Sequence, residues 1–160
     1  MGMTCYLQQI TPERLEAVKN DSSLLPSVIN SEENPEEPLD IDKTWQGIHF
    51  LLTGEVGGGD PPLANALLGG TVFENASDYI FASFLTSDEV KEVTEALRGI
   101  SEKELKDRFN TEEMNELKLY PSFNNWIDDD FDYLLGNYKD MVDYYKSAAE
   151  KGNPMLVYIL

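Results

Sequence analysis

The sequence predicts a single α+β domain that is rich in helices and has a small sheet containing the N-terminal and C-terminal strands. Three observations support this fold class. Apolar residues recur at spacings of three and four in several segments between residues 12 and 151, which is typical of amphipathic helices. Short apolar segments lie at 3–9 and 155–160, as expected for strands. The 160 residues contain no internal repeat and no linker, so one domain is expected over 1–160.

The predicted strands lie at both ends and in the middle of the chain. In 3–9, Met3, Cys5 and Leu7 share one face by the period of two. The segment 79–85 is almost wholly apolar, which favours a strand buried on both faces, and 71–73 is a shorter candidate. The two terminal strands would expose apolar edges if they were separated, so we expect them in one sheet.

Several helix boundaries are visible as capping patterns. A capping box begins at Thr86 and a second at Ser101, each with glutamate three residues later. Thr11 and Thr111 are expected to cap two further helices, and Leu63–Leu68 is expected to form a short one. The longest predicted helix runs from about 129 to 151, with aspartates at its start and lysines at its end.

Residues 31–38 form the one segment that is typical of disorder. They comprise Ser-Glu-Glu-Asn-Pro-Glu-Glu-Pro, so the segment has no apolar side chain whose burial could offset the entropy lost on ordering. We predict a flexible, solvated acidic loop. An acidic docking motif is the alternative interpretation.

The segment 39–54 contains the candidate site. Asp42 is expected to cap a helix in which Trp45 and His49 lie one turn apart on an apolar face. In a structural interpretation, Trp45 and His49 pack inward and Lys43 is free. In a functional interpretation, Asp42, Lys43, Trp45 and His49 line a cleft for a ligand.

No catalytic, metal or cofactor motif is complete. The glycine run at 54–60 ends in Asp60-Pro61 and lacks the Lys-Ser/Thr of a phosphate-binding loop. The aspartates at 128–132 lack the glycine and glutamate of a calcium loop. One histidine and one cysteine do not make a zinc site. Cys5 and His49 are the one nucleophile–base pair to consider, but Cys5 is expected to be buried and inert. We therefore predict no cofactor, no metal and no catalytic residue.

Net charge restricts the partners. Thirty acidic residues face twelve basic ones, which gives a formal charge of −18. This charge repels nucleic acids and anionic membranes. No apolar run reaches the roughly 18 residues of a membrane-spanning helix. With a single cysteine and an N-terminus unlike a secretory signal, the expected location is the cytoplasm.

Several blocks, in the same order along nearly the whole chain, resemble one known family. They are Met1-Gly2-Met3, the run 39–54, Leu67-Leu68-Gly69-Gly70, Leu119-Tyr120-Pro121, and the ending from Tyr145 through Gly152-Asn153. The most specific is Asp-x-Asp-Lys-x-Trp-x-x-x-His-x-x-Leu-Thr-Gly at 40–54. The blocks resemble the YfbM-like family of small bacterial proteins, a domain of unknown function. This resemblance implies a bacterial cytoplasmic protein with an α+β fold, and it brings no accepted activity and no catalytic residues.

Two functions follow as expectations. The first is a non-enzymatic protein-interaction module of acidic character, whose partner is another protein, in particular a basic one attracted by charge. The alternative is a small-molecule-binding domain or enzyme that uses a cleft near Trp45 and His49. The sequence does not determine an oligomeric state.

Overall fold

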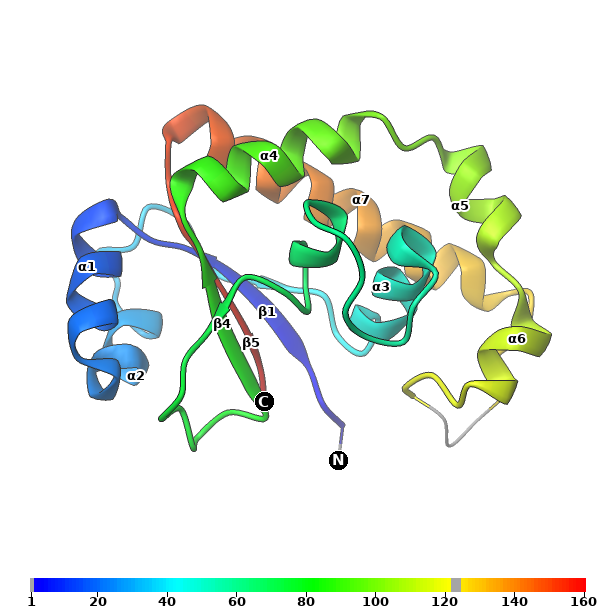
Figure 1. Ribbon diagram of the computed structural model, residues 1–160, viewed down its shortest axis with the longest axis horizontal. Coiled ribbons are helices and arrows are strands. Elements are labelled where there is room, and N and C mark those ends of the chain that lie inside the picture. The colour runs from blue at the N-terminus through cyan, green and yellow to red at the C-terminus, as the bar shows by residue number, and fades with distance from the viewer. Residues whose placement is uncertain (1, 122–124) are drawn as a thin grey trace.

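Five short strands form one antiparallel sheet in a computed structural model that describes residues 2–121 and 125–160. The strand order is β2-β1-β5-β4-β3 (Figure 1). The strands are β1 (Cys5–Gln9), β2 (Leu39–Asp40), β3 (Thr71–Val72), β4 (Phe81–Leu85) and β5 (Met155–Ile159). The α-helices are α1 (Pro12–Asn20), α2 (Leu25–Ile29), α3 (Trp45–Thr53), α4 (Ser87–Arg98), α5 (Glu102–Arg108), α6 (Thr111–Glu116) and α7 (Asp130–Lys151), and the 3₁₀ turns are η1 (Ser22–Leu24) and η2 (Leu63–Asn65).

The two terminal strands lie side by side, as the sequence predicts. β1 pairs with β5 from Cys5 opposite Ile159 to Gln9 opposite Met155. On its other side β5 pairs with β4, so the last strand of the chain is the centre of the sheet. The α+β fold class with both terminal strands in one sheet is confirmed.

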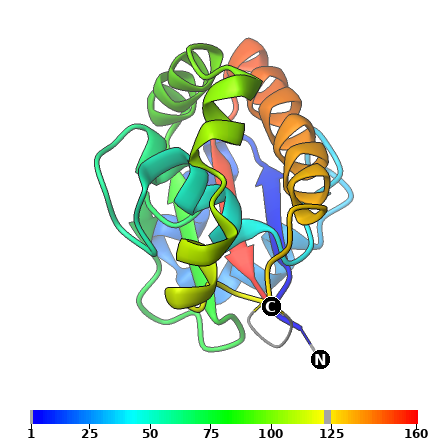
Figure 2. The ribbon, with the colours of Figure 1, turned by 90° about the vertical axis from the view of Figure 1, so that its right-hand side faces the viewer.

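Helices cover both faces of the sheet. The alternation along β1 directs Cys5 and Leu7 toward a large core that also contains the apolar faces of α3, α4 and α7. On the opposite face, Leu156 and Phe84 pack with α1 and α2 in a second, smaller core. Figures 1 and 2 show the result, with α1 and α2 on one side of the sheet and the remaining helices on the other.

The capping predictions are confirmed at several helix ends. The Thr86 hydroxyl accepts a hydrogen bond from the Glu89 backbone N–H at 3.2 Å, and the Glu89 carboxylate accepts one from the Thr86 N–H at 3.0 Å. At α5 the cap forms without the full box: the Ser101 hydroxyl accepts from the Glu104 N–H at 3.1 Å, and the Glu104 carboxylate accepts from the Ser101 hydroxyl at 3.3 Å instead of from its backbone N–H. α7 ends at Gly152, whose φ of 71° places it in the left-handed region that glycine adopts without steric cost.

Three local predictions are wrong, and one short strand was not predicted. Asp42 does not cap α3, because the N-cap is Thr44, which makes no side-chain capping bond. Residues 63–68 contain only the 3₁₀ turn Leu63–Asn65. The cap of α6 is Asn110, one residue before the predicted one. The two-residue strand β2 was not expected, since two residues show no periodicity.

Within residues 2–121 and 125–160, the apolar content and length of the helices are insufficient for any of them to cross a bilayer.

Candidate functional site

Asp42 and Lys43 form a small polar cluster with α7 rather than a helix cap. Tyr133 donates a hydrogen bond from its hydroxyl to Asp42 Oδ2 at 2.7 Å and accepts one from the Lys43 backbone N–H at 3.3 Å. Lys43 Nζ lies 3.0 Å from Asp42 Oδ1, so it is paired and not free. The Tyr133 bond, followed by those of Lys43, holds the pKa of Asp42 below its ordinary value. Burial, reinforced by Asp42, raises the pKa of Tyr133 to about 12.

Trp45 joins the start of the chain to the start of α3. Its indole N–H donates to the carbonyl of Met3 at 2.9 Å, and its ring stacks on Tyr120 with centroids 5.2 Å apart. Tyr120 in turn accepts a hydrogen bond from the Met3 N–H at 2.6 Å. The inward packing expected of Trp45 is confirmed, since 8% of the residue is exposed.

His49 is buried and contacts the glycine-rich loop. One percent of the residue is exposed, and Nε2 lies 2.8 Å from the carbonyl oxygen of Gly58. A carbonyl accepts only, so Nε2 carries the proton and Nδ1 is the bare nitrogen. Nδ1 is buried without a hydrogen-bond partner. Burial lowers the pKa of His49, since the charged form would lose its hydration.

The four predicted residues therefore make three separate sets of contacts. Asp42 and Lys43 come together at Tyr133, Trp45 contacts Met3 and Tyr120, and His49 contacts Gly58. None of these four residues lines the pocket described next. That these four residues line a cleft for a ligand remains a hypothesis.

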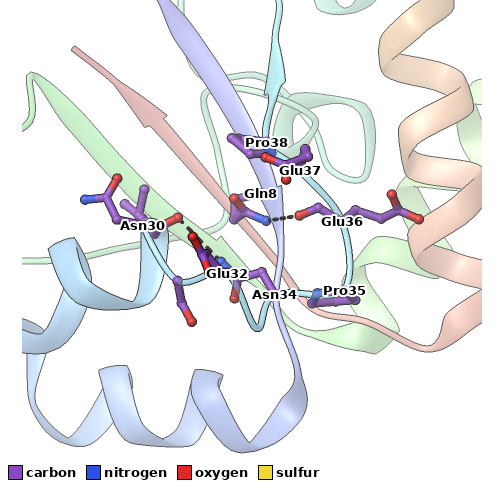
Figure 3. Close-up of a pocket in the computed structure, with 10 residues that line it drawn as sticks. Gln8, Asn30, Glu32, Asn34, Pro35, Glu36, Glu37 and Pro38 are labelled. Atoms are coloured by element: carbon purple, nitrogen blue, oxygen red, sulfur yellow. Dashed lines mark hydrogen bonds between the residues drawn. The ribbon is translucent and has the colours of Figure 1, made fainter.

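A pocket of about 420 Å³ lies elsewhere, between β1, the end of α2 and the loop 31–38 (Figure 3). The loop that encloses it is the acidic segment singled out in the sequence. The wall is mostly polar, and three of its side chains are the exposed carboxylates of Glu32, Glu36 and Glu37. Its remaining members are Gln8, Ile29, Asn30, Ser31, Asn34, Pro35 and Pro38.

Hydrogen bonds from three elements hold the loop over this pocket. Gln8 of β1 donates from Nε2 to the carbonyl of Glu36 at 2.8 Å. Tyr144 of α7 donates from its hydroxyl to the carbonyl of Glu37 at 2.9 Å. Asn34 donates from Nδ2 to the carbonyl of Val28, in α2, at 2.8 Å. These bonds attach the loop at residues 34, 36 and 37 to its surroundings, and the flexibility expected of the segment 31–38 as a whole stays a prediction.

Gln8 contributes a buried acceptor without a donor. The residue has no exposed surface, and its Nε2 donates both to the Glu36 carbonyl and to the Gln9 carbonyl at 2.8 Å. These two acceptors fix which end of the amide is nitrogen. Oε1 is therefore the atom left without a partner. A buried polar atom in this state costs about 1–3 kcal/mol, which a donor placed beside it would recover.

Asn34, in the loop itself, repeats the arrangement. Its Nδ2 contacts the carbonyls of Val28 and Ile29 at 2.8 and 3.4 Å, which leaves Oδ1 buried and unpartnered. Both amides thus spend their donors on the backbone and present only acceptors. Neither oxygen has appreciable accessible surface, so both are enclosed by protein atoms rather than open to the pocket.

The charge at the pocket is negative. Lys151 forms an ion pair with Glu36. Over the described part of the chain, no ion pair involves Glu32 or Glu37. Two carboxylates at the rim are thus left uncompensated by a neighbouring cation, which favours a positively charged ligand.

Sequence reasoning marked the acidic loop but missed Gln8. A glutamine in a strand is ordinary, and its partner Glu36 lies 28 residues away. The one available signal was the pair of glutamines, Gln8 and Gln9, at the end of the strand, and polar residues at strand ends are too common to identify a site.

Comparisons with known proteins place this fold in a family. A family model described as a domain of unknown function (DUF1877) matches residues 1–158, and the chain belongs to that family. Protein YfbM of Escherichia coli strain K12 is 27% identical over 168 aligned positions, covering 100% of this chain and 99% of the relative. The crystal structure of YfbM from Escherichia coli, described there as a protein of unknown function, matches with a TM-score of 0.80 at 23% identity, covering 98% and 99% of the two chains. The resemblance seen in the sequence is thereby confirmed.

Proposed function

We propose that the protein is a non-enzymatic interaction module of acidic character that binds a basic protein. The observation that supports this most directly is the anchored acidic loop. Hydrogen bonds from Gln8 and Tyr144 fix the backbone beneath Glu36 and Glu37, so little entropy is lost when a partner binds there. The charge of −18 adds long-range attraction for a basic partner.

The environments of Cys5 and His49 support the non-enzymatic part of the proposal. Cys5 has no exposed surface, and burial raises the pKa of its thiol far above the physiological range. His49 donates to a backbone carbonyl rather than activating a nucleophile. As part of the proposal, the protein acts in the cytoplasm, where a single reduced cysteine is ordinary.

Small-molecule binding near Trp45 and His49 is the second candidate. The feature in its favour is the unpartnered Nδ1 of His49, which could accept one hydrogen bond. Against it, Trp45 and His49 are almost completely buried and engaged in internal contacts. These contacts favour structural roles for both side chains.

Affinity capture from a bacterial lysate tests the proposal, with two baits compared with the parent. The double variant Glu32→Gln/Glu37→Gln removes two charges at the pocket. The control Glu112→Gln/Glu116→Gln removes two exposed charges on α6, at the opposite end of the molecule (Figure 1). Retained proteins are identified by mass spectrometry at about 50 and 500 mM NaCl, which span weak and strong screening.

We expect a basic protein on the parent and on the α6 control at low salt. It should be lost from the pocket variant and, for all baits, at high salt. Equal retention by the pocket variant and the control would place the contact elsewhere. Retention only of neutral or acidic proteins would contradict the proposal.

A further inference from the structure

We propose that His49 is a pH-dependent latch for the glycine-rich loop 54–60, in which the neutral ring holds the loop closed and the protonated ring releases it. The loop leaves the C-terminal end of α3, the helix that carries His49 (Figure 1). This inference is independent of the proposed function, because the loop 31–38 and its carboxylates take no part in it.

Two side chains of α3 hold the loop by its backbone. His49 donates from Nε2 to the carbonyl of Gly58 at 2.8 Å, and Gln46, one turn earlier, donates from its Nε2 to the carbonyl of Val56 at 3.3 Å. Within residues 2–121 and 125–160, no other hydrogen bond reaches residues 56–59. The bond from His49 is the shorter of the two, so the closed position of the loop depends mainly on that ring.

The composition of the loop allows it to open without unfolding the rest of the molecule. Every residue from 54 to 60 is exposed, so opening gives up little apolar contact. A Cβ built on Gly57 or Gly58 would have no heavy atom within 4 Å, which shows that the backbone there is not packed against other elements. Opening therefore costs little beyond the two hydrogen bonds to Gln46 and His49.

Protonation of His49 changes what the closed loop can satisfy. In the neutral ring Nε2 donates to Gly58, and the bare Nδ1 is buried without a partner. A proton on Nδ1 creates a donor without an acceptor, on a charged ring that has almost no exposed surface. A buried charge without a partner is far more costly than a buried neutral acceptor. Gly58 is the exposed group in contact with the ring, so water gains access to the ring when the loop moves away from α3.

The charged groups around the ring do not compensate an imidazolium. Burial lowers the pKa of His49 and outweighs the attraction of Glu55 in the loop. In the part of the chain that the structure describes, neither Glu55 nor Asp60, the two carboxylates of the loop, forms an ion pair with His49. On α5, Asp107 and Arg108 lie at the C-terminal end of α3, where Arg108 donates to backbone carbonyls of the helix. The element η2 contains no charged residue, and α7 meets the core through apolar and tyrosine side chains.

NMR of the untagged full-length protein between about pH 8 and 5 tests the latch. The ring ¹⁵N resonances of the only histidine follow its protonation, and backbone order parameters follow motion of the loop. We expect the ring to titrate with a midpoint below the ordinary value of about 6.5. The order parameters of residues 56–59 should fall from about 0.85 to below about 0.6 with the same midpoint. The amide resonances of β5 should be unchanged, because the release is local.

Three variants connect the loop motion to the ring. His49→Gln keeps a donor for Gly58 and does not titrate, so its loop should stay rigid over the whole pH range. Gly58→Ala and Gly57→Ala form a matched pair, because both positions have open space but only Gly58 has a positive φ, of 72°. Alanine at position 58 strains the closed loop and should raise the midpoint toward that of a free imidazole by about 0.5–1 pH unit. Gly57→Ala should keep the midpoint of the parent, and this pair decides the question if His49→Gln does not fold.

Four results at the loop would overturn the latch. They are protonation of the ring with unchanged order parameters, a loop that is equally mobile at both ends of the pH range, an equal fall of the order parameters in His49→Gln, and equal midpoints for Gly58→Ala and Gly57→Ala. Loss of the β5 resonances at the midpoint of the ring would also overturn it, because protonation would then unfold the whole molecule instead of releasing the loop.

Discussion

At the scale of single residues, the buried polar side chains differ in how completely their hydrogen-bonding groups are used. Thr94 is satisfied, since its hydroxyl contacts the carbonyls of Val90 and Tyr145 at 2.7 and 3.2 Å. Gln8 and His49 each leave one acceptor buried and unpaired. Such atoms are rare in folded proteins and point either to a ligand or to a local cost in stability. Both atoms are enclosed by protein, so we assign the second meaning to Gln8 and to His49.

His49 should make stability depend on pH. The pKa of His49 is lowered in the fold. Above the unfolded value of about 6.5 the ring is therefore neutral in both states, and His49 does not reduce the stability of the fold. As pH falls below that value, the unfolded chain takes up a proton that the folded chain resists, and stability is lost. One proton limits the slope to about 1.4 kcal/mol per pH unit.

Chemical denaturation of the parent and of His49→Gln between about pH 7 and 5 measures this, because glutamine keeps a donor for Gly58 and does not titrate. His49 is the only histidine, so the difference between the two proteins isolates it. Parallel pH profiles would show that the ring is protonated without cost.

Cys5 should be unreactive in the folded protein. It has no exposed surface and lies on a strand paired on both sides. A thiol reagent therefore needs global or large local opening, and labelling should be at least ~1,000-fold slower than in denaturant. Ellman's reagent measures both rates, and comparable rates would show that β1 opens readily.

Sequence predicted the burial of Cys5, Trp45 and His49 because period-two and helical spacing place them on apolar faces. It failed at Asp42, whose φ of 54° is outside the helix and whose carboxylate contacts Tyr133, 91 residues away. An aspartate before a helix favours a cap locally. The hydrogen bond between Asp42 and Tyr133 of α7 overrides that preference. No local sequence pattern predicts a bond between residues so far apart.

At the scale of elements, the turn that follows α6 contains a strained residue. Lys118 is exposed and has a φ of 54°, in the left-handed region that glycine occupies without steric cost. Lys118→Gly should stabilise the protein by about 0.5–1 kcal/mol, the strain relieved less the extra entropy of unfolded glycine. Lys118→Ala retains the Cβ and should be nearly neutral. Urea denaturation of both variants measures this, and a destabilising glycine would show that the lysine side chain contributes more than its backbone costs.

The position of β5 gives a stronger prediction. The last strand pairs with both β1 and β4, and all five of its residues are buried. Deleting residues 155–160 should abolish folding, because both neighbours lose their ladders and the two cores lose their shared centre. Near-UV circular dichroism would be lost, whereas deleting Leu160 alone should preserve it. A folded truncated protein would mean that β1 and β4 can pair directly.

Long elements with clear ends were predictable, as α4 and α7 show, because a capping residue and a sustained apolar stripe agree. Short elements were not. β2 exists because Leu39 and Asp40 pair with Leu7 and Tyr6, and neither residue carries a strand signal by itself. The pocket depends on this same pairing, since β2 follows directly on the loop 31–38.

At the scale of the whole molecule, charge acts against compactness. Within the described residues, cationic side chains pair with seven of the thirty carboxylates. The others repel one another across the surface, and this self-repulsion lowers the stability of the folded state. If the proposed basic partner exists, the same unpaired charge would attract it.

Salt should therefore stabilise the protein. Between about 20 and 300 mM NaCl the screening length falls from roughly 20 to 6 Å, which suppresses repulsion between distant carboxylates. We expect the melting temperature to rise by a few degrees, as about 1 kcal/mol corresponds to 2–8 °C for domains of this size. Glu116→Gln should melt higher than the parent at low salt and respond less to added NaCl, because one repelling charge near the carboxyl end of α6 is gone. A melting temperature that falls with salt would mean that the seven ion pairs outweigh the repulsion, and the surface charge would then stabilise the fold as well as attract a partner.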